Sequence, residues 1–189
     1  MGEAKLNRKL NLVLDVETEK GTVHIHSTPI SRTVFEDNFL VISRAFTSVY
    51  TNSLGPVTGP RVAALLLRDE AKKMDVWDKT QQSLIAEIHR LTSVIFPGDS
   101  GWETVPWDVA KKRGILDEDS AAEVENCVVY FICASSIHLK AEMVVATEGL
   151  KTLWGAVTTS SNATEYMRSL PTSTQAETTG ETQQTAANQ

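Results

Sequence analysis

Residues 31–50 read SRTVFEDNFLVISRAFTSVY, and this stretch decides how the first half of the chain folds. Its large apolar side chains recur at every third or fourth position, at Phe35, Phe39, Ile42, Phe46 and Val49. That spacing is the period of one helix face and is too regular for a strand. Ser31 is a good N-cap residue, and Ile30 before it can pack on Phe35 and fix where the helix begins. We therefore expect one amphipathic helix over 31–50, with its apolar stripe in the core.

The segment before this helix predicts a β-hairpin. In residues 10–16 apolar and polar side chains alternate, which is typical of a half-buried strand. A polar turn ends at Gly21, and a second alternating run follows in which His24 and His26 point outward. Because an isolated hairpin is only marginally stable in water, we expect residues 10–26 to lie against the helices.

Helical periodicity recurs along the rest of the chain. The predicted helices have an apolar stripe and are bounded by Gly, Pro or charged residues, and they cover residues 61–74, 81–94, 106–113, 117–138 and 162–170. Residues 99–106 are expected to form a loop. The sequence leaves open whether the long helix breaks near His138 or continues to Trp154.

These elements predict an α+β fold that is mainly α. The N-terminal hairpin is packed on a bundle of five to six helices, within one domain over residues 1–170. From Pro171 the composition changes to a Thr/Gln-rich segment with no apolar residue larger than Ala. Such a segment buries too little surface to offset the entropy of ordering it, so 171–189 is predicted to be a disordered tail.

The charge and composition exclude several classes of protein. The net charge is −6 among 189 residues, which argues against a binder of nucleic acid or of anionic membranes. No stretch approaches the ~18 consecutive apolar residues of a membrane span, and the N-terminus lacks the apolar core of a signal peptide. We therefore expect a protein of a reducing cytoplasm. Cys127 and Cys133 are six positions apart on a helix, which is beyond disulfide reach, and are expected to be small buried side chains.

Few residues carry a chemical signature. His24 and His26 share one strand face and are the best metal candidates, but a useful site needs a third and fourth ligand that the spacing does not supply. The acidic run over 117–125 lacks the pattern of a calcium loop. The common nucleophile and phosphate-binding motifs do not occur in the sequence. We therefore expect no enzyme, no metal and no cofactor.

The four tryptophans are the candidates for a contact surface. Each lies in or beside a predicted loop or helix end, at Trp77, Trp102, Trp107 and Trp154. Tryptophans at such places are often half-buried packing residues, and they are also preferred anchors of protein–protein contacts. The packing role is the favoured interpretation for any one of them, and the contact role is the one that bears on function.

Four stretches follow one another between about residues 6 and 173. They read LNLVLDVETEKGTVHIHSTPISRTVFEDNFLVISRAF, LGPVTGPRVAALLLRDEAKKM, DEDSAAEVENCVVYFICASS and LKTLWGAVTTSSNATEYMRSLPTS. Their order and composition resemble the tail assembly chaperones of long-tailed bacteriophages. The closing TEYMRSLPTS and the polar tail carry most of the resemblance, since such chaperones often end in an interchangeable polar extension.

The resemblance implies a definite function. Proteins of that class bind the tape measure protein while the tail is built, keep its apolar helices in solution and help recruit the tail tube protein. They also self-associate, act in the host cell cytoplasm and are absent from the finished virion. An acidic helical protein can hold an amphipathic client helix in an apolar groove, and several weakly bound copies along one client gain avidity. The alternative is a structural virion protein, a minor tail or head–tail joining component.

Overall fold

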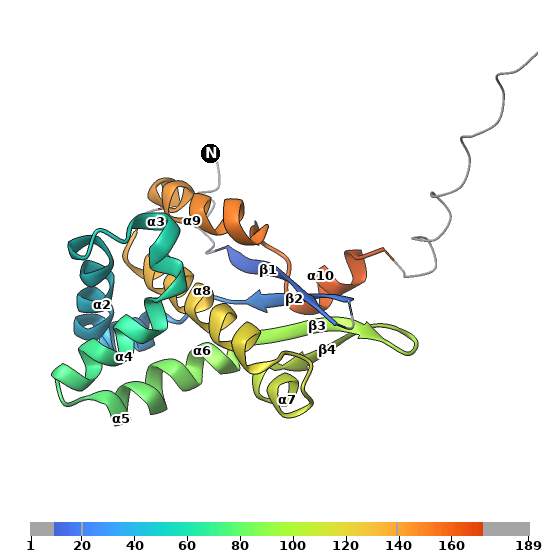
Figure 1. Ribbon diagram of the computed structural model, residues 1–189, viewed down its shortest axis with the longest axis horizontal. Helices are drawn as coiled ribbons and strands as arrows, with labels where there is room; N and C mark the ends of the chain where they lie inside the picture. Colours follow the sequence, from blue (N-terminus) through green and yellow to red (C-terminus); the bar gives the residue numbers. More distant parts are fainter. Residues whose placement is uncertain (1–9, 20, 139, 172–189) are drawn as a thin grey trace, which may run out of the picture.

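The computed structural model describes residues 10–19, 21–138 and 140–171, and these form a mixed α/β fold (Figure 1). Its strands are β1 (Asn11–Thr18), β2 (Gly21–Ser27), β3 (Thr92–Gly98), β4 (Gly101–Pro106) and β5 (Val157–Thr159). They form one antiparallel sheet in the order β4-β3-β2-β1-β5. The predicted hairpin is confirmed as β1 and β2, at the centre of a sheet that is larger than expected. The predicted tail beyond residue 171 lies outside the described residues.

Most helices lie in two runs of sequence. Between β2 and β3 are α1 (Arg32–Asp37), α2 (Phe39–Thr51), α3 (Gly55–Thr58), the 3-10 turn η1 (Gly59–Arg61), α4 (Ala63–Lys73), α5 (Trp77–Thr80), the π-helical turn η2 (Gln81–Ile85) and α6 (Ala86–Arg90). After β4 come α7 (Trp107–Lys112), α8 (Glu118–Ile137) and α9 (Lys140–Trp154), and α10 (Ala163–Ser169) follows β5. The long helix therefore ends before His138. No helix in the described ranges is long and apolar enough to cross a membrane.

The helix predicted over 31–50 is interrupted at Asn38. The backbone of Asn38 leaves the helical region, with φ −118° and ψ 11°, and this residue ends α1 and begins α2. Its buried side chain donates to the Val34 carbonyl at 2.9 Å and accepts from Ser83 Oγ at 3.1 Å. The interruption turns the second part of the stripe, so the prediction of a buried position is wrong for Phe39, whose side chain lies outside.

Two further predictions are wrong in the middle of the chain. The helix expected over 81–94 ends at Arg90, and the next residues form β3; the loop expected over 99–106 is β4. The β-branched and aromatic residues of β3 favour a strand, and β2 offers a partner edge through the pairs from His24↔Ile95 to Ser27↔Thr92. A two-residue turn between Gly98 and Gly101 then closes a second hairpin.

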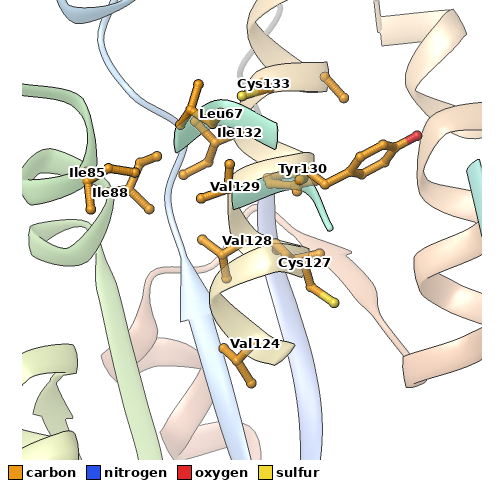
Figure 2. Packing of buried hydrophobic residues seen from close by; sticks show 14 of the residues in the cluster. Leu67, Ile85, Ile88, Val124, Cys127, Val128, Val129, Tyr130, Ile132 and Cys133 are labelled. Atoms are coloured by element: carbon orange, nitrogen blue, oxygen red, sulfur yellow. The ribbon is translucent and has the colours of Figure 1, made fainter. Parts of the chain in front are cut away.

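The core is assembled around α8. This helix is buried around most of its circumference, through Ala121, Val124, Cys127, Val128, Val129, Tyr130, Phe131, Ile132, Cys133 and Ala134. Figure 2 shows Leu67 of α4, Ile85 of η2 and Ile88 of α6 gathered beside its apolar side chains. A helix that is hydrophobic on most sides must be covered on most sides. η1, α4, α9, α2, α6 and β1 of the sheet all pack on α8. Cys127 and Cys133 are free and buried in this core, as predicted.

The second face of β2 is also buried, which corrects the expectation for its histidines. Val23 and Ile25 point into the core around α8, and His24 and His26 point to the opposite face. We expected both histidines to be exposed, yet they are buried. The reason is α10, which contacts β3 and β4 and brings Tyr166 against both imidazole rings.

Candidate contact surface

The outer side of α2 carries three large apolar side chains in contact with solvent. Phe39 is 53 % exposed, Leu40 56 % and Tyr50 50 %, while Ile42 and Phe46 on the same helix point into the core. Residues of one helix face repeat every three or four positions, and α2 has more apolar residues than one such face can hold. The sequence shows this excess as apolar residues beside the stripe, Leu40 and Tyr50 among them.

Two of these aromatic rings are held in place by buried neighbours. The ring of Phe39 packs edge-on against Phe35 at 5.7 Å, and that of Tyr50 packs edge-on against Phe46 at 5.2 Å, both measured between ring centroids. Edge-to-face packing is a preferred arrangement of aromatic pairs and stabilises them by about 0.5–1.5 kcal/mol beyond the burial of their surface. The exposed rings of Phe39 and Tyr50 are thus each in contact with a buried ring of the same segment.

The neighbouring helix α4 also has an exposed apolar side chain. α4 packs beside α2, and Ser48 Oγ of α2 donates to Glu70 Oε1 of α4 at 3.3 Å (Figure 1). Leu65 of α4 is exposed, although Leu67 two positions later is completely buried. We call Phe39, Leu40, Tyr50 and Leu65 the α2–α4 side chains.

Among the predicted tryptophans, Trp77 lies beside an open hollow. It begins α5 and is half-buried, with the Arg68 guanidinium 5.4 Å above its ring centroid. The hollow has a volume of about 440 Å³ and is lined by Lys72, Asp75, Val76, Trp77, Asp78 and Lys79. Two lysines and two aspartates leave this rim without net charge, so it offers no strong attraction for a charged ligand.

The other three tryptophans have partners within the fold. Trp107 is 1 % exposed and lies in the core, so its indole is not available to a partner in this conformation. Trp154 Nε1 donates to Glu123 Oε1 at 3.2 Å and connects α9 to α8. Trp102 packs on His24. The four residues lie on α5, β4, α7 and α9, and no ring contact joins any two of them among the described residues, so they do not form one surface.

A histidine between two carboxylates lies where α6, α7 and α8 meet. His89 Nε2 donates to Glu125 Oε1 at 2.9 Å, and His89 Nδ1 is 3.9 Å from Asp108 Oδ1. The hydrogen bond from His89 lowers the pKa of Glu125, against the opposite effect of burial.

Burial raises the pKa of Cys127 and of Cys133 to about 12. A thiol with such a pKa is not a nucleophile at neutral pH. His89 and Glu125 therefore have no nucleophilic cysteine to activate.

The predicted histidine pair is held by protein groups. His24 Nδ1 donates to Asp15 Oδ1 at 2.6 Å, and His26 Nε2 donates to the Ser161 carbonyl at 2.9 Å. Within the described ranges, no group of three or more His, Cys, Asp or Glu side chains is placed to hold a metal ion. The histidines therefore connect the sheet to the segment around α10.

Comparisons of the chain with protein families, with curated proteins and with solved structures found no match. What bears on function is thus the set of α2–α4 side chains, together with the resemblance of the four sequence stretches.

Proposed function

We propose that this protein is a tail assembly chaperone of a long-tailed bacteriophage. In this role it binds the tape measure protein during tail morphogenesis, helps recruit the tail tube protein and stays in the host cytoplasm. The resemblance of the four sequence stretches supports this proposal. The structural observation that carries it is the exposure of Phe39, Leu40 and Tyr50 on the outer side of α2.

These side chains suit a helical client. Phe39 and Tyr50 are eleven positions apart on one helix, which corresponds to about 16 Å along the axis at ~1.5 Å per residue. An amphipathic client helix laid along α2 would cover that length with about three turns and would present anchors at its i, i+3, i+4 and i+7 positions.

The size of the surface implies weak binding by a single copy. Fully burying a large apolar side chain is worth about 1.5–3 kcal/mol, and half of each of the three is already buried. About 3 kcal/mol is then gained in total, which alone gives a weak complex. A long helical client with many similar segments gathers several copies, and self-association of the chaperone raises the effective concentration further.

Capture of the client by an altered α2 tests the proposal. The double variant Phe39→Ser with Leu40→Ser should fold, because both side chains are more than half exposed, and should lose at least five-fold in captured tape measure protein. Val157→Ser, which alters an exposed residue of β5, is the matched control and should capture as much as the unaltered protein. Captured tape measure protein is measured by quantitative mass spectrometry. Equal amounts with the unaltered protein, the double variant and the Val157→Ser control would show that α2 does not bind the client.

A further inference from the structure

The sheet face opposite α8 has the short helix α10 packed on it, at β3 and β4. Val13 of β1 and Ile95 of β3 are both 0 % exposed, yet neither belongs to the hydrophobic cluster around α8. They share their face with His24 and His26, since paired residues of antiparallel strands point to the same side. α10 contacts β3 and β4 on this side of the sheet (Figure 1).

The polar attachments of this segment are at its two ends. The Ser161 carbonyl accepts from Asn11 Nδ2 at 2.8 Å and from His26 Nε2 at 2.9 Å, and the Pro171 carbonyl accepts from Trp102 Nε1 at 2.8 Å. Between them, the Tyr166 ring lies 5.9 Å from His24 and 6.5 Å from His26, measured between centroids. Asn11, His26 and Trp102 of the sheet thus donate to main-chain oxygens. Because every polypeptide has such oxygens, these hydrogen bonds do not require a particular side chain in the bound segment.

The two sides of this contact are unequally buried. The sheet face is completely covered at Val13 and Ile95, whereas none of the residues of α10, all of them described, is buried. α10 also begins with its own capping box, in which Asn162 and Glu165 exchange side-chain to main-chain hydrogen bonds. The start of α10 is therefore stabilised by bonds within its own segment.

We propose that this sheet face is a binding site for a short amphipathic helix of a partner protein, and that α10 occupies the site in cis. The partner helix presents an aromatic side chain to the two histidines, as α10 does with Tyr166. His26 and Trp102 bind its main-chain oxygens. α10 thereby limits access to the site, and a partner helix binds when it replaces α10. This site is separate from the α2–α4 side chains, so it can exist whether or not the client proposal is correct.

A peptide added in trans tests the site. The probe is a fluorescently labelled peptide of residues 160–171, SSNATEYMRSLP, titrated into the full chain and followed by anisotropy. Tyr166→Ser in the protein weakens the internal competitor, so the peptide should bind this variant at least ten-fold more tightly than the unaltered chain. Thr164→Ser, at an exposed position of α10, is the matched control and should bind like the unaltered chain.

The place of binding is tested by a second change. Adding Trp102→Phe to the Tyr166→Ser protein keeps a ring but removes the indole N–H, and should weaken peptide binding several-fold. Equal binding by the unaltered and Tyr166→Ser proteins, or no binding by either, would overturn the proposal.

If the Tyr166→Ser protein does not fold, hydrogen exchange on the unaltered chain tests whether the peptide displaces α10 from the sheet. Saturating peptide should speed exchange of the amides of 163–169 and leave those of 12–14 protected. Unchanged exchange over 163–169 would overturn the proposal.

Discussion

Replacing Gly149 by alanine should destabilise the protein, contrary to what helix propensity predicts. Gly149 lies inside α9, where Gly→Ala normally stabilises a helix by about 1 kcal/mol. In this fold α9 lies against α3, and a Cβ placed on Gly149 would be 2.0 Å from the Pro56 carbonyl oxygen and 2.8 Å from its carbon. These are main-chain atoms, so no side-chain rotation can relieve the contact.

The magnitude follows from the displacement required. Ordinary contact begins at 3.4 Å, so α9 and α3 must separate by about 1.4 Å, the difference between 3.4 and 2.0 Å. Overpacking of this kind costs about 1–3 kcal/mol, and a gap of that size also reduces the dispersion contacts of the buried Leu150. Taking about 3 kcal/mol for the clash and about 1 kcal/mol for the gain in propensity, the free energy of unfolding should fall by about 2 kcal/mol. The melting temperature should then fall by roughly 4–8 °C.

Thermal and urea unfolding followed by circular dichroism measure this effect. Glu148→Ala is the matched control, because Glu148 is the preceding residue of α9 and is exposed, so its replacement should change stability by no more than about 0.5 kcal/mol. A Gly149→Ala protein as stable as the unaltered one, or more stable, would show that α9 does not lie against Pro56.

Three further predictions concern buried groups. Trp107→Ala should lower the free energy of unfolding by about 3–5 kcal/mol, because it empties a core position that is 1 % exposed; a loss below about 1 kcal/mol in urea would place the indole at the surface. Glu125→Gln should destabilise the protein at pH 7, where the carboxylate accepts from His89. Because the native pKa of Glu125 is lowered from its ordinary value of 4.5, that stabilisation is present above about pH 4.5 and is lost as the pH falls through the lowered native value. The difference in melting temperature between the two proteins should therefore shrink as the pH is lowered below about 4.5, and a constant difference would contradict this assignment. Cys127 and Cys133, whose pKa burial raises to about 12, should resist a thiol reagent at pH 8 in the native protein and react fully in urea; rapid native labelling would refute their burial.

The parts of the fold that the sequence predicted are those with a local signal. β1 and β2 alternate clearly and are joined by a short turn, so their hairpin was visible. β3 was hidden because the apolar residues of the preceding helix continue at helical spacing into Val94 and Ile95. Its partner is β2, and the hydrogen bond between Ser27 and Thr92 spans 65 positions, a distance over which local periodicity carries no information.

The exposure of the large apolar side chains was predicted less well than the fold, for the same reason. The exposure of Phe39 depends on the interruption at Asn38, which is stabilised by a hydrogen bond from Ser83, 45 positions away. Trp107 was a contact candidate because it stands at a helix start, but packing against His89 and the sheet places it in the core. Local sequence marked which side chains are large and apolar, and long-range packing decided which of them meet solvent.

Affinity capture from phage-producing cells tests the proposed function most directly. The tagged protein is recovered during tail assembly, and mass spectrometry is applied both to the captured material and to the finished particles. The chaperone proposal predicts that a long helical tape measure protein and the tail tube protein are captured, and that this protein is missing from the particles. A stoichiometric amount of it in the particles would contradict the proposal and identify a structural virion protein.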